Sequence, residues 1–181
     1  VQPAIKDDPA ASSLCQLVAY LMLLVLIQTV YFPRTKLREM FATQRGSWVF
    51  YPIAAALGVS ILFPASAIYE AALARWPDKA QGPEILGAFQ SLPPWRKAAA
   101  AVGLCVTTPL VEEALFRGAL FGTLRRRNAA ALVVVATASL FALVHLQPQL
   151  FLPIAMVGAA LAFLRVASGS IWPGVVLHVA F

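Results

Sequence analysis

Long apolar runs alternate with short polar segments along the whole chain. The first run, Leu14–Phe32, has no charged residue over 19 positions, and a helix needs about 20 such residues to cross a bilayer. It lacks the positive n-region and the cleavage site of a signal peptide, so we expect a retained helix. The six predicted spans are Leu14–Phe32, Ser47–Tyr69, Ala98–Leu124, Ala129–Leu146, Leu150–Leu164 and Ile171–Phe181. The pattern predicts an all-α fold, a polytopic transmembrane helical bundle with about six spans.

Composition supports a membrane protein and excludes a nucleic-acid partner. Apolar residues make up 60% of the chain and charged residues 12%, with a mean hydropathy of +0.77, whereas a soluble domain carries about 25% charged residues. The net charge is +6, but the basic residues cluster between the apolar runs, as they do in cytoplasmic loops of membrane proteins. Cys15 and Cys105 both lie in apolar runs without metal-ligand spacing, so we expect neither a metal site nor a disulfide there.

The distribution of basic residues predicts an orientation. The segments Arg34–Arg45, Arg125–Arg127 and Arg165, which would lie on one side of the membrane, carry eight Lys and Arg residues. The segments that would lie on the other side carry five. Because an excess of Lys and Arg marks the cytoplasmic side, we expect Arg125–Arg127 inside and the N-terminus outside. Between the second and third runs, Glu84–Leu92 places its apolar residues on one helical face, which suits either a helix lying on the membrane or an ordered loop.

Three charged residues interrupt the third apolar run, "TPLVEEALFRGALFG" (Thr108–Gly122). Glu113 and Arg117 are four positions apart, so they share a helical face and can form an ion pair. Glu112 points about 100° away from Glu113 and has no such partner on its own helix. All three can form a packing network, but ionisable groups within a membrane indicate a functional site by default.

Two histidines add to this polar group. His145 ends "SLFALVH" in the fourth run, one turn after Phe141, and His178 lies in "PGVVLHVAF" at the end of the chain. Either one alone is more typical of a satisfied core histidine. Together with Glu112, Glu113 and Arg117 they indicate a site within the membrane.

The chemistry that suits such residues is hydrolysis. A buried carboxylate can act as a general base on water, with a histidine beside it, and a second imidazole can donate to the oxyanion that develops on the attacked carbonyl. The chain has no H-E-x-x-H motif and no G-x-S-x-G motif. A zinc site built from Glu112, His145 and His178 stays open as an alternative, because zinc accepts these ligand types.

The same residues resemble a known family. "EEALFR" (Glu112–Arg117) fits an EExxxR motif, "FALVH" (Phe141–His145) fits FxxxH, and "GSIWPGVVLH" is similar to the approach to a third motif, HxxxN or similar. These are the motifs of the CPBP, or Abi, family of CAAX-processing and bacteriocin-processing intramembrane proteases. The resemblance covers roughly Lys97–Phe181. We therefore divide the chain into variable N-terminal membrane helices and a connecting loop, residues 1–96, and a CPBP-like catalytic core, residues 97–181.

The resemblance implies a site with a glutamate-activated water and no cofactor. It implies that Glu112 is the general base, that His145 is its partner on the water, and that His178 helps to form the oxyanion hole. Glu113 and Arg117 would orient and balance the site. The family's third motif ends in a polar residue four positions after its histidine, which here would be position 182. Because the chain also begins with Val, we expect a piece of a longer protein, with the core cut short at its C-terminus.

The implied function is an intramembrane endopeptidase that cuts a peptide bond of a membrane-associated protein or peptide. We expect a multi-pass integral protein, with the lipid bilayer of a bacterial plasma membrane as its surroundings. Two other functions stay open. One is a non-enzymatic membrane scaffold or immunity protein in which the polar cluster braces the bundle, and the other is a zinc metalloprotease that uses the same Glu and His residues.

Overall fold

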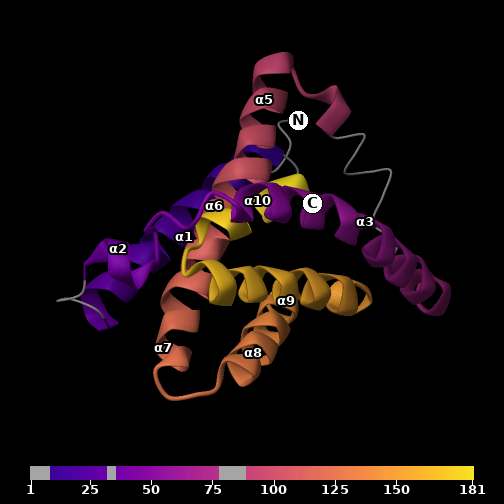
Figure 1. Ribbon diagram of the computed structural model, residues 1–181. Coiled ribbons are helices and arrows are strands. Elements are labelled where there is room, and N and C mark those ends of the chain that lie inside the picture. Colours follow the sequence, from indigo (N-terminus) through magenta and orange to yellow (C-terminus); the bar gives the residue numbers. More distant parts are fainter. Residues whose placement is uncertain (1–8, 32–35, 78–88) are drawn as a thin grey trace.

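The computed structural model describes residues 9–31, 36–77 and 89–181, and these residues form helices and connecting turns with no strand (Figure 1). This confirms the all-α class for the described part of the chain. The principal α-helices are α1 (Pro9–Tyr31), α2 (Leu37–Met40), α3 (Phe50–Arg75), α5 (Pro94–Val102), α6 (Thr108–Glu113), α7 (Phe121–Arg125), α8 (Ala130–Leu143), α9 (Phe151–Ser168) and α10 (Trp172–Ala180).

Three helical stretches of the described chain are long and apolar enough to cross a membrane, namely Phe50–Arg75, Pro94–Arg125 and Pro148–Ser168. Two apolar helices, Leu17–Val30 and Ala130–Leu143, are shorter, and α10 has nine residues. The count of six spans therefore stays a prediction, although helices occupy all six predicted positions. The third stretch begins at Pro94 rather than at the predicted Ala98, because proline suits the first turn of a helix.

The stretch Pro94–Arg125 is helical throughout but not α-helical throughout. Two π-helical segments, η3 (Gly103–Thr107) and η4 (Ala114–Leu120), lie on either side of α6. Each wide turn shifts the faces that the following side chains occupy, and such turns are frequent at functional sites. The 3.6-residue periodicity used for the sequence does not reveal them. Glu112 and Glu113 end α6, directly before the second π-helical segment.

Small residues bring the helices of the core close together. At Gly58 of α3, an added Cβ would lie 2.6 Å from the carbonyl oxygen of Leu177 in α10, and at Gly158 of α9 it would lie 3.1 Å from Cα of Ala138 in α8. Such close approach is typical of helix packing in membranes, where van der Waals contact drives association. The main buried apolar cluster lies among these four helices and includes Phe141, Leu161, Leu164 and Leu177.

The segment after α2 ties the N-terminal half to the turn between α9 and α10. The amide of Ile171 donates to the carbonyl of Ala42 at 3.1 Å, and Nε1 of Trp172 donates to the carbonyl of Thr43 at 2.9 Å. Gly169 ends α9 with a φ of 69°, a left-handed conformation that glycine adopts without strain. These contacts fix where α10, and therefore His178, begins.

The predicted surface segment Glu84–Leu92 lies for the most part in residues 78–88, outside the described residues. The predicted orientation and the predicted shortened C-terminus remain predictions, because neither a bilayer nor residues after Phe181 belong to the structure.

Gly118 and Gly122 provide a matched test of the close helix contacts. A Cβ at Gly118 would lie 2.7 Å from Cα of Phe41, whereas a Cβ at Gly122 would meet nothing within 4 Å. We expect Gly118→Ala to destabilise the protein by about 1–3 kcal/mol through overpacking, and Gly122→Ala to leave stability unchanged or raised by up to about 1 kcal/mol. Thermal unfolding of the purified protein in detergent measures both. Equal stability of the two variants would contradict the packing of Phe41 on Gly118.

Candidate active site

The predicted ion pair is present and fully buried. Nη1 of Arg117 lies 3.0 Å from Oε1 of Glu113, and neither side chain has any solvent-exposed area. The pair connects the end of α6 to the π-helical segment η4, because the residues are four positions apart. Two charges buried together offset each other, but either one alone would be very costly in this apolar interior.

Further groups hold Arg117 in place. Nη2 of Arg117 donates to the carbonyl of Gly158 at 2.9 Å, so the side chain reaches from η4 to α9. The guanidinium also lies 4.4 Å from the centre of the Phe141 ring, a geometry in which the ring face attracts the cation. Arg117 therefore joins three helical segments as well as neutralising Glu113.

Helix α10 packs against Glu113 on the side opposite Arg117. A Cβ added at Gly174 would collide with Oε2 of Glu113, so the lack of a side chain at this position lets α10 lie directly against the carboxylate. His178, one turn further along α10, places Nδ1 4.0 Å from Oε1 of Glu113. The contact between α10 and α6 thus brings the second histidine to the paired glutamates.

Glu112 has different neighbours from Glu113. Its Oε2 lies 3.6 Å from Nε2 of His178, and its Oε1 accepts a hydrogen bond of 3.4 Å from the hydroxyl of Tyr20. Its side chain keeps 10% of its exposure, against none for Glu113. Glu112 is therefore the more accessible of the two carboxylates and is not held by the arginine pair.

Sequence reasoning missed Tyr20. It lies in α1, 92 residues from Glu112, in a run that reads only as a generic membrane helix. The one local signal is that a tyrosine hydroxyl in an apolar run needs a polar partner. Pairing it with Glu112 required knowing that α1 lies beside α6.

His145 follows α8, and its own backbone fixes its ring. Nδ1 lies 2.7 Å from the carbonyl oxygen of Phe141. Since a carbonyl oxygen only accepts, the hydrogen of this contact lies on Nδ1, and Nε2 is the ring nitrogen that faces other groups. The Phe141 ring contacts both histidines edge to face, with centroid distances of 5.0 Å to His145 and 5.9 Å to His178. Phe141 therefore separates and positions the two imidazoles.

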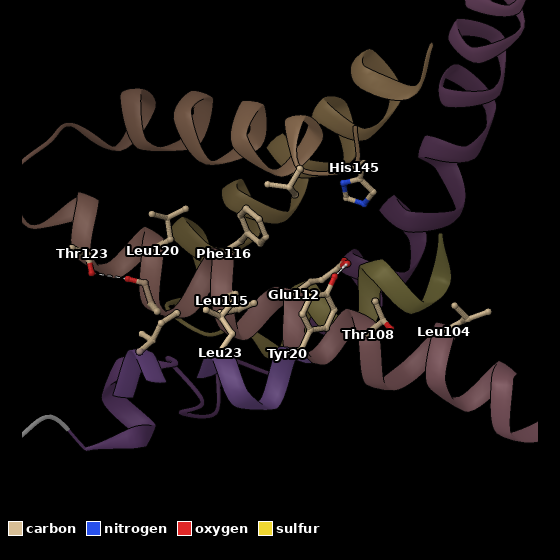
Figure 2. Close-up of a pocket in the computed structure, with 13 residues that line it drawn as sticks. Tyr20, Leu23, Leu104, Thr108, Glu112, Leu115, Phe116, Leu120, Thr123 and His145 are labelled. Atoms are coloured by element: carbon tan, nitrogen blue, oxygen red, sulfur yellow. Dashed lines mark hydrogen bonds between the residues drawn. The ribbon is translucent and has the colours of Figure 1, made fainter. Parts of the chain in front are cut away.

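A cavity of about 900 Å³ opens at these residues. Glu112 and His145 both line it, together with Tyr20 (Figure 2). Its remaining walls are mainly apolar and are formed by Leu23, Ile27, Leu104, Thr108, Leu115, Phe116, Ala119, Leu120, Thr123 and Val144. Figure 2 shows the polar groups between an apolar arm toward Leu115 and Leu120 and a second side toward Thr108 and Leu104. The polar residues thus lie where an extended apolar molecule would pass.

The structure brings the five predicted residues together, but only two of them line the cavity. Glu112 and His145 line the cavity, while His178 lies beside Glu112 and the Glu113–Arg117 pair is buried behind it. Among the described residues, no three or more His, Cys, Asp or Glu side chains are grouped so as to hold a metal ion. The arrangement suits an accessible carboxylate and imidazole supported by a closed charged pair.

Comparison with known proteins gives one match. Residues 94–181 match the model of the family described as Rce1-like, type II CAAX prenyl endopeptidase Rce1-like. This match confirms the resemblance to CAAX-processing proteases that the motifs indicated. No curated protein and no solved structure matches the chain.

The two glutamates should differ in their effect on folding. We expect Glu113→Gln to lower stability by about 3–5 kcal/mol, because it leaves the buried Arg117 unpaired. Glu112→Gln keeps the shape and hydrogen-bonding capacity of a residue that has no arginine partner, and it should leave the yield and thermal stability of the protein nearly unchanged. The measurement is the amount of monodisperse protein after extraction and its unfolding temperature in detergent.

The double variant Glu113→Gln with Arg117→Met serves as the control for the charge. Removing both charges should restore part of the stability that Glu113→Gln loses. Similar losses in Glu112→Gln and Glu113→Gln would show that the ion pair does not distinguish the two positions.

Proposed function

We propose that this chain, whose residues 94–181 match the model of the Rce1-like family of type II CAAX prenyl endopeptidases, is an endopeptidase that hydrolyses a peptide bond within the membrane. One observation carries the proposal. Glu112 and His145, from two different helical segments, line the same cavity inside an apolar bundle. A carboxylate and an imidazole that line the same cavity can hold and activate a water molecule between them.

Glu112 is the general base in this proposal. It accepts a proton from a water that Nε2 of His145 also holds, and the water oxygen forms a bond to the carbonyl carbon of the peptide. The resulting tetrahedral intermediate carries its negative charge on the former carbonyl oxygen. Glu112 then returns the proton to the amide nitrogen, the C–N bond breaks, and a carboxylic acid and an amine form. The acid passes its proton to the amine or to solvent as the two products leave.

The remaining polar residues support this step. His178 lies 3.6 Å from Glu112, and in this proposal it donates a hydrogen bond to the oxyanion, where such donors are most effective. Tyr20 donates to Glu112 and so orients its carboxylate. Glu113 and Arg117 act as positioning residues, because they are closed off from the cavity and hold α6, η4 and α9 in register.

The walls of the cavity favour an apolar substrate. Leucine, isoleucine and phenylalanine side chains line most of its surface, which suits a membrane-associated protein or peptide. The matched family is described as CAAX prenyl endopeptidases, so we propose a peptide with a lipid-modified C-terminal segment as the substrate class. In this proposal the apolar arm toward Leu115 and Leu120 takes part of such a segment beside Glu112 (Figure 2).

A non-enzymatic scaffold accounts for part of the site only. The Glu113–Arg117 pair and Phe141 are bracing contacts that a scaffold would also use. A scaffold has no need of a cavity lined by a second carboxylate and an imidazole. The cavity therefore favours an enzyme.

Cleavage should depend on both cavity-lining residues. We expect Glu112→Gln and His145→Asn each to lower kcat by about 10²–10⁴-fold, the usual contribution of general acid–base catalysis. Leu132→Ala, an exposed position on α8, is the control and should keep full activity. The assay is cleavage of a farnesylated CAAX peptide by the protein purified in detergent, with products identified by mass spectrometry.

Comparing the membrane peptides of cells that make the wild type or Glu112→Gln provides an independent substrate search. Full cleavage by Glu112→Gln in both assays would rule out the glutamate mechanism. Cleavage of other membrane peptides, but not of the farnesylated probe, would support the glutamate mechanism and contradict the proposed substrate class.

Catalysis by this arrangement needs no metal. The guanidinium of Arg117 is held close to Glu113, where it would repel a cation, and a water held by Glu112 and His145 needs no Lewis acid. We expect exhaustive chelation to change the rate of peptide cleavage by less than about twofold. Loss of a catalytic group would lower the rate by about 10²-fold or more. The measurement pairs the cleavage rate with the metal content of the same sample. Activity that disappears with the metal and returns with zinc would instead support the metalloprotease alternative.

A further inference from the structure

We propose that a second pocket, separate from the candidate active site, binds a phosphate-bearing anion, supplied either by an acidic lipid headgroup or by free phosphate. This pocket has a volume of about 340 Å³ and shares no lining residue with the first. It lies between the end of α7 and the last turn of α9. The residues that line it are Phe121, Gly122, Arg125, Arg126, Arg165 and Val166.

No carboxylate of the described residues forms an ion pair with its three arginines. Residues 94–181 contain two acidic residues, Glu112 and Glu113, and both belong to the candidate active site. In the described part of the chain, no ion pair involves Arg125, Arg126 or Arg165. Three guanidinium groups around one pocket therefore leave a concentrated positive charge that a bound anion would neutralise.

Arg165 is held in position rather than left free in solvent. Its Nε donates to the backbone carbonyl of Arg117 at 3.0 Å, and its guanidinium lies 5.5 Å from the centre of the Phe121 ring. Because these contacts fix a partly buried cation in an apolar protein, the side chain is prepared for an anionic partner. Arginine favours phosphate oxygens, since its planar group donates two parallel hydrogen bonds.

Arg125 and Arg126 supply the outer side of the pocket. Arg125 is exposed and donates to the carbonyl of Asn128 at 2.9 Å, which holds its side chain at the turn between α7 and α8 (Figure 1). Gly122 leaves open space in the wall, with nothing within 4 Å of an added Cβ. The pocket thus combines an anchored inner arginine, two outer arginines and room for a small anion.

The position of the pocket in the chain suits a lipid headgroup. The turn at Arg125–Arg127 follows the spanning stretch Pro94–Arg125, and its basic residues are of the kind that lie beside acidic lipids on the cytoplasmic side. Basic pockets between membrane helices bind anionic headgroups in this setting. The hydrogen bond from Arg165 to Arg117 also connects this pocket to the backbone that carries the buried ion pair.

The test is direct binding to the purified protein in detergent, which needs no proteolysis. One arm adds phosphatidylglycerol, with phosphatidylcholine as the uncharged-headgroup comparison, and counts retained lipid by native mass spectrometry. A second arm adds inorganic phosphate as ligand and as competitor. The variants are Arg125→Gln, Arg126→Gln and their combination, which change exposed side chains and should fold. Arg127→Gln is the matched control, because Arg127 is the exposed neighbour that does not line the pocket.

We expect saturable binding of phosphatidylglycerol over phosphatidylcholine, weakened about fivefold for each of Arg125 and Arg126 removed and unchanged by Arg127→Gln. Arg126→Lys should recover most of the binding, which separates charge from fold. Competition by phosphate with the same arginine dependence would identify free phosphate as the ligand source. Equal weakening by Arg127→Gln, or no preference for either phosphate-bearing anion over phosphatidylcholine, would overturn the proposal.

Discussion

The buried ion pair between Glu113 and Arg117 is the interaction on which the rest of the structure depends. An apolar bundle accepts a buried charge only where an opposite charge and further polar groups lie next to it. Arg117 meets this need by contacting Glu113, the carbonyl of Gly158 and the face of Phe141 at once. These contacts bring α9, and Phe141 in the last turn of α8, against the segment that carries Glu112. The pair thus builds the site without entering the cavity.

The same constraint explains why glycines lie around the site. Gly158 offers its carbonyl to Arg117, and Gly174 leaves the space that Glu113 occupies. A Cβ at Gly174 would collide with Glu113, and one at Gly158 would lie 3.1 Å from Cα of Ala138, so the neighbouring groups would have to shift. Neutralisation of Glu113 by Arg117 leaves Glu112 as the accessible carboxylate, with Tyr20 and His178 as its neighbours. The two adjacent glutamates therefore differ in role: Glu113 is part of the structural ion pair, and Glu112 is the carboxylate available for chemistry.

The sequence predicted the helical class, the positions of the apolar runs and the Glu113–Arg117 pair, because each depends on local spacing. It did not predict the π-helical segments around α6, since the 3.6-residue period assumes a uniform helix. Tyr20 was missed because its contact spans 92 residues. The sequence also grouped His178 with the other polar residues without showing that it lies beside Glu112 rather than in the cavity wall. Such features depend on which helices pack together, and the spacing of apolar and polar residues in one sequence does not reveal this.

The most direct measurement of the central claim is where a substrate peptide lies in the protein. A photoreactive diazirine amino acid at Leu115, which lines the cavity, would be compared with one at Leu132, which is exposed on α8. Both would be placed in Glu112→Gln protein, so that a farnesylated CAAX peptide stays uncut. The account predicts cross-linking from position 115, lost on adding excess unlabelled peptide, and little from position 132. Equal cross-linking from both positions, or none from position 115, would contradict it.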